Sequence, residues 1–182
     1  MANLKEIRNR ISSVTSTMKI TSAIKMVSAA KLKKAQDAIT AMRPYSEKLN
    51  ELMSSFSNVI SSSIISFLSL KRPVKKVLVI AVASNRGFCG AFNSNIIKKA
   101  KSLILSERFS NAEFEFIVFG KKVNDVLVKT ENIAKNASEI FEDLTYRNVS
   151  EIVDEIIDDF AKEKYDHVEL IYNSFKNAAN QI

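Results

Sequence analysis

The sequence predicts an α/β protein, in which a long N-terminal coiled-coil helix is followed by a small Rossmann-like α/β domain with a largely parallel sheet. Two observations predict this class. Through about the first forty residues, apolar side chains recur every three to four positions, which is the spacing of a helix. From Lys76 onward, continuous β-rich runs alternate with helical segments, as in proteins with a parallel sheet. We therefore expect an N-terminal helical arm, the shaft helix, over residues 1–70 and the α/β domain over residues 71–182.

The arm begins with a coiled-coil seam. Its apolar residues alternate at spacings of three and four, which places them on one side of a helix that needs a partner helix. The same frame continues to Met42, so we expect a rod of roughly 60 Å that ends or kinks at Pro44. The predicted helix-pairing seam consists of Leu4, Ile7, Ile11, Val14 and Met18.

The middle of the arm has a different pattern. Between Ala23 and Ala30 the apolar residues spread over roughly 220° of the helix surface, and many of them are small. We expect a helix of this kind to be enclosed by more than one neighbour. An ordinary coiled-coil dimerisation arm remains the simpler alternative.

The net charge of +7 is concentrated in the arm. Up to Leu70 there are ten basic and four acidic side chains, whereas the rest of the chain is nearly neutral. The lysines are scattered around the helix without interleaved aromatic residues, which argues against nucleic-acid binding. The uncharged window over residues 52–70 contains eight serines and a one-sided apolar stripe, which favours an amphipathic helix over a membrane span.

The second part predicts three strands and three helices. The strands are "KVLVIAVAS", "EFEFIVFG" ending at Gly120, and "HVELIYNSF". Between them, Asn93 or Ser94 is expected to cap the helix "NIIKKAKSLILSERF", and "KKVNDVLVK" is a short helix. Asn148 or Ser150 is expected to cap the helix "VSEIVDEIIDDFAKE".

The loop "SNRGFCGAFN" follows the first strand, at the sheet edge where ligands of open α/β sheets bind. It lacks both glycine-rich phosphate-binding fingerprints, so a homo-oligomeric module that binds nucleotides or anions is kept only as an alternative. A cysteine-dependent enzyme is a second alternative, because "GFCGA" imitates a nucleophile elbow. A thiol nucleophile needs a base, and the only histidine of the chain is His167. It starts a later strand, so we expect it at the opposite edge of the sheet from Cys89.

We therefore interpret the loop as a structural turn formed by Gly87, Cys89 and Gly90, with Cys89 a small buried side chain. One cysteine and one histidine cannot supply a closed set of soft metal ligands, and one cysteine excludes an intrachain disulfide framework. The N-terminus "MANLKEIRNR" is charged where a signal peptide needs an apolar run, so we expect no export signal there.

Several stretches resemble one known family. "ITSAIKMVSAAKL" and "SNRGFCGAFN" closely resemble the γ subunits of F-type ATP synthases, and "MANLKEIRNRISSV" and "HVELIYNSFKN" are similar to other parts of them. The resemblance implies a central-stalk rotor that couples proton flow to ATP synthesis or hydrolysis without being catalytic or binding a cofactor. It implies α and β subunits around the shaft, the ε subunit and the c-ring at its foot, and a peripheral location on the cytoplasmic face of the bacterial inner membrane.

The resemblance also implies roles for residues of the arm. The seam should face a partner helix, and contacts with the β subunits are expected at Lys19, Ile24, Lys25, Met26 and Lys31. Family members continue beyond the position that matches Ile182, so we expect this chain to be truncated and to lack the C-terminal shaft helix. An unpaired seam then predicts self-association of the chain through the arm.

Overall fold

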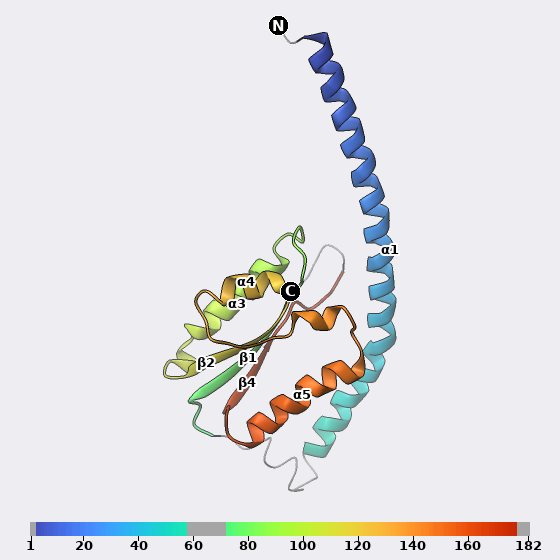
Figure 1. Ribbon diagram of the computed structural model, residues 1–182. Coiled ribbons are helices and arrows are strands. Elements are labelled where there is room, and N and C mark those ends of the chain that lie inside the picture. Colours follow the sequence, from blue (N-terminus) through green and yellow to red (C-terminus); the bar gives the residue numbers. More distant parts are fainter. Residues whose placement is uncertain (1–2, 58–71, 178–182) are drawn as a thin grey trace. The chain divides into compact units, whose positions relative to one another are not determined.

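The computed structural model describes residues 3–57 and 72–177. The chain divides into two compact units, Met1–Ser61 and Ser62–Ile182, which are described separately. The expected fold class is confirmed: a long N-terminal helix is followed in the chain by a parallel sheet with helices (Figure 1).

The first unit contains the single long helix α1, Leu4–Ser57. At 1.5 Å per residue its 54 residues extend over about 80 Å, so the helix does not end at Pro44 and the expected length of roughly 60 Å is too short. Pro44 lies inside the helix. A proline removes one backbone hydrogen bond, but the helix-forming residues "SEKLNELM" that follow Pro44 sustain the remaining turns.

The second unit is a four-stranded parallel sheet among the described residues, in the order β3-β2-β1-β4. The sequence predicted three of these strands and missed β3, which is only four residues long and too short to show a clear apolar pattern. The elements in chain order are β1 Lys76–Val82, α3 Phe92–Ile104, η1 Glu107–Phe109, β2 Glu113–Phe119, α4 Lys121–Leu127, β3 Ile133–Asn136, η2 Ser138–Phe141, α5 Tyr146–Ala161 and β4 His167–Ile171 (Figure 1).

Both faces of the central strand β1 are apolar, as a strand between two helical layers requires. Val77, Val79 and Ala81 pack on the face covered by α3 and α4. Leu78 and Ile80 pack on the opposite face with apolar residues of α5 (Figure 1). The sheet therefore has helices on both sides, which is the layered arrangement that the alternating strands and helices predicted.

The helix starts differ from the predicted caps. Helix α3 begins at Phe92 after Ala91, and no side chain caps it, because the Asn93 amide is used inside the preceding loop. Helix α5 begins earlier than expected, and its cap is Thr145, whose hydroxyl oxygen accepts a hydrogen bond from the Asn148 backbone N–H. Asn148 therefore lies inside the first turn, where its side chain donates to the Asp143 carbonyl.

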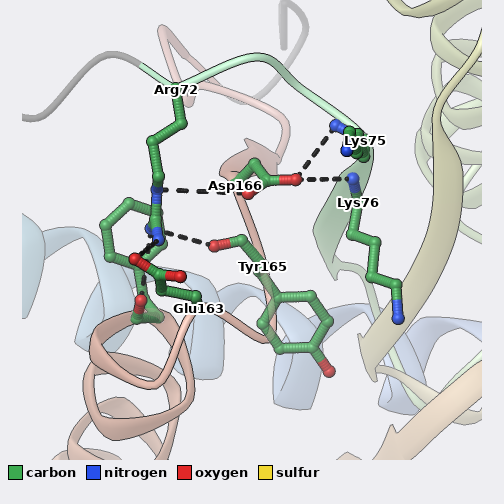
Figure 2. Close-up of polar contacts among 7 residues, drawn as sticks. Arg72, Lys75, Lys76, Glu163, Tyr165 and Asp166 are labelled. Carbon is green, nitrogen blue, oxygen red and sulfur yellow. Dashed lines mark hydrogen bonds and ion pairs between the residues drawn. The ribbon is translucent and has the colours of Figure 1, made fainter.

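An ionic network holds the start of β1 against the turn between α5 and β4 (Figure 2). The Asp166 carboxylate accepts hydrogen bonds from the backbone N–H groups of Lys75 and Lys76, at 2.9 and 3.0 Å. Arg72 donates to the carbonyl oxygens of Phe160 and Tyr165, at 3.2 Å each. Burial acts to raise the pKa of Asp166, but the two backbone donors and the Arg72 charge outweigh it and lower that pKa below its usual value.

Tyr165 is the largest fully buried side chain on the α5 side of the sheet. Its hydroxyl donates to the Glu115 carboxylate at 2.6 Å, which satisfies the buried polar group. Burial and this hydrogen bond raise the pKa of Tyr165 to about 12. The tyrosine therefore stays neutral and belongs to the core.

Candidate functional surfaces

The predicted seam lies on α1 as one row of exposed side chains. Its five members are between 45% and 71% exposed, although all are large and apolar. A helix that presents such a row to solvent gains little from burial within its own unit, so the row is available to a partner. The helical backbone of the seam is confirmed, while the pairing itself stays a prediction.

A shallow groove on α1 joins the end of the seam to the predicted contact segment. Val14 and Met18 line it together with Lys25. The hydroxyls of Thr17 and Thr21, which also line the groove, donate to the helix carbonyls four residues earlier. Because those donors are used within the helix, the groove offers mainly apolar contact with one positive charge at its end.

The predicted contact residues surround the helix rather than forming one face. At 100° per residue, Ile24 and Lys31 lie about 20° apart, Lys19 and Met26 form a second pair, and Lys25 lies between these two groups. All five are exposed. This distribution suits a helix with neighbours on several sides, and the contacts themselves remain predicted.

The loop between β1 and α3 is organised by asparagine side chains. Asn93 accepts a hydrogen bond from the Ser84 backbone N–H at 3.1 Å and donates to the Arg86 carbonyl at 3.1 Å. Asn85 donates to the Ser138 carbonyl and accepts from the Lys121 backbone N–H, both at 2.9 Å. The Asn85 amide thus ties the loop to the segments that follow β2 and β3.

This polar organisation overturns the prediction for Cys89. The thiol is exposed and not buried, and its sulfur accepts a hydrogen bond from the Asn93 amide at 3.2 Å. Gly90 has a left-handed φ of +59°, but the other left-handed residue of the turn is Phe88, at +57°, and not Gly87. Phe88 is fully exposed, so the loop presents an aromatic ring to solvent.

The crevice that binds ligands in related α/β folds is crossed by the protein's own hydrogen bond. Strand β1 lies between β2 and β4, where the direction of the crossovers reverses, and ligands bind at the carboxyl ends of such a strand pair. There the Asn173 amide donates to the Phe92 carbonyl at 3.0 Å and joins the segment after β4 to the start of α3. This contact argues against the nucleotide-binding alternative.

His167 is positioned as the sequence predicted. It pairs in register with Val77, at the amino end of the parallel strands, whereas Cys89 lies beyond their carboxyl ends. From Val77 to Val82 alone, a strand rises roughly 17 Å, far beyond the reach of a proton transfer. The Nε2 atom of His167 lies 2.8 Å from a Glu169 carboxylate oxygen, so the imidazole interacts locally. The geometry argues against the cysteine-enzyme alternative.

Residues 3–57 and 72–177 contain neither a metal-binding cluster nor a membrane-spanning helix. No group of three or more histidine, cysteine, aspartate or glutamate side chains in this part could hold a metal ion. No helix described here combines the length and apolar character needed to cross a bilayer. The predicted amphipathic window over residues 52–70 is helical up to Ser57, and its remainder lies outside the described residues.

Comparison with known proteins identifies the family. The family model described as ATP synthase matches residues 3–182. The chain belongs to the ATP synthase family. Among curated members, the ATP synthase gamma chains of Flavobacterium johnsoniae and Flavobacterium psychrophilum are 55% and 54% identical to it over 182 residues. In both cases the match covers the whole of this chain but only 63% of the relative, so the chain spans less than two thirds of their length.

Solved structures show the same ATP synthase fold. The central stalk of the Tetrahymena thermophila mitochondrial ATP synthase superimposes with a TM-score of 0.59 at 26% identity, covering 90% of this chain and 69% of the other. The rotor of the Euglena gracilis mitochondrial ATP synthase has the same TM-score at 18% identity, covering 96% and 58%. The resemblance to γ subunits that the sequence motifs indicated is therefore confirmed.

In this ATP synthase family member, sequence reasoning missed the residues that organise the α/β domain. Asn85, Asn93 and Asn173 hold the loop ends, and Arg72 holds the entry to β1. The only sequence signal was the density of asparagines around the glycine-rich turn, because Asn side chains often satisfy backbone groups in irregular segments. Partners distant in sequence, such as Phe160 for Arg72, leave no local pattern.

Proposed function

We propose that this chain is the N-terminal shaft helix and α/β domain of an ATP synthase gamma subunit, the central-stalk rotor. In that role it couples proton flow through the membrane sector to ATP synthesis or hydrolysis in the ring of α and β subunits. One observation carries the proposal: 55% identity with the Flavobacterium johnsoniae gamma chain extends over all 182 residues, including both the arm and the domain.

The form of α1 supports a mechanical role. A helix of 54 residues with exposed apolar side chains along its length is a rod whose surface is suited to contact other chains. Its seam is suited to a second helix, which would make the rod stiffer than a single helix. Small and basic residues around Lys25 suit a surrounding sleeve, since a large dry interface would hold the rod too tightly to turn.

A non-catalytic role fits the geometry of the reactive side chains. Cys89 and His167, the residues that a thiol mechanism would need together, lie at opposite ends of β1. The loop at the carboxyl end of β1 is fixed by amide hydrogen bonds. We infer that the subunit binds no cofactor and contributes torque, while the bond-making chemistry belongs to other subunits of the complex.

The partners follow from the same role. We infer α and β subunits around the arm, with the proposed contacts at Lys19, Ile24, Lys25, Met26 and Lys31. The ε subunit and the c-ring are proposed at the foot of the stalk, which is supported by a matching structure described as a central stalk with its c-ring. The proposed location is peripheral, on the cytoplasmic face of the bacterial inner membrane.

A chimera tests the proposal. The 182 residues replace the matching part of the Flavobacterium johnsoniae gamma chain, and ATP-driven proton pumping is measured in inverted membrane vesicles. We expect the chimera to assemble with α and β subunits and to pump protons.

A double variant of the chimera tests the proposed contacts. Replacing Lys25 and Lys31 by alanine (Lys25→Ala with Lys31→Ala) should lower the number of protons pumped per ATP hydrolysed by about twofold or more, because two charges facing the surrounding subunits are lost.

The matched control removes the same charge from the same helix, through Lys33→Ala with Lys34→Ala, and should leave that ratio unchanged. A chimera that assembles but hydrolyses ATP without pumping would contradict the rotor role. Equal ratios in the two double variants would instead contradict only the assignment of Lys25 and Lys31 as contacts.

A further inference from the structure

We draw no further inference here: the strongest candidate, the exposed Phe88 ring on the left-handed turn between β1 and α3, is an apolar surface of the α/β domain, and nothing in the structure shows what covers it.

Discussion

Gly120 is a position where the sheet leaves no room for a side chain. A Cβ atom there would lie 2.8 Å from the backbone carbonyl carbon of Ala83, and its φ of +130° is one that other residues rarely adopt. We expect Gly120→Ala to lower the free energy of unfolding by roughly 1–3 kcal/mol. Urea unfolding followed by near-ultraviolet circular dichroism measures the change.

Gly87 provides the matched control for that substitution. It has no left-handed φ, and nothing lies within 4 Å of where its Cβ would be. Gly87→Ala should therefore change the free energy of unfolding by less than about 0.5 kcal/mol. If the two alanine variants unfold at the same urea concentration, the close approach of β2 to Ala83 is not what requires glycine.

Asp166 makes the stability of the α/β domain depend on pH. Its pKa is lowered in the folded protein, so its contribution is fully present above the ordinary carboxyl pKa near 4 and disappears as the pH falls through the lower folded value. We expect Asp166→Asn to reduce the free energy of unfolding at pH 7 by about 1–3 kcal/mol, because the backbone N–H groups of Lys75 and Lys76 lose a charged acceptor and Arg72 loses one of its carboxylate partners. The difference from the wild type should shrink below pH 4.

Urea unfolding at pH 7 and at pH 3 measures that difference, with Asp125→Asn as the control because Asp125 is exposed on α4. A difference that is the same at both pH values would show that the Asp166 charge is not responsible. Loss of protection from hydrogen exchange at the Lys75 and Lys76 amides, which donate to Asp166, should accompany the destabilisation.

At the scale of the element, the exposed seam of α1 predicts self-association of the chain. Ile11 and Val14 lie in the middle of the seam, and each is more than half exposed. We expect the light-scattering mass to rise above the monomer value of 20.4 kDa with concentration, and Ile11→Asn with Val14→Asn to return it to that value. Ser12→Asn with Ser13→Asn is the control in the same turn. A constant monomer mass for the wild type would contradict the prediction.

The elements also show what could be read from the sequence. Helices with long apolar periods and strands with continuous apolar runs were predicted correctly, because burial of one face leaves a regular pattern. Strand β3 and the start of α5 were not, because a four-residue strand and a threonine cap involve too few residues. The passage of α1 through Pro44 shows that flanking helix formers can outweigh one lost hydrogen bond.

At the scale of the whole molecule, the family and fold class were predictable because motifs from both parts of the chain kept their order. The contacts that organise the α/β domain were not, since they join residues far apart in sequence. Asn173 reaches Phe92, and Arg72 reaches Phe160 and Tyr165. The prediction of a buried Cys89 failed for a different, local reason, because the Asn93 amide that fixes its turn was interpreted as a helix cap.

The ionic network of Arg72 and Asp166 at the start of β1 has a mechanical consequence. A pull transmitted along the chain into the α/β domain enters just before β1, the strand with a parallel neighbour on each side. Pulled along its length, β1 loads the hydrogen bonds to β2 and β4 together, in shear, and does not open them one after another. Asp166, just before β4, accepts from the Lys75 and Lys76 amides, and Arg72 donates to the end of α5, so the load also reaches α5 and the start of β4 at the point of entry.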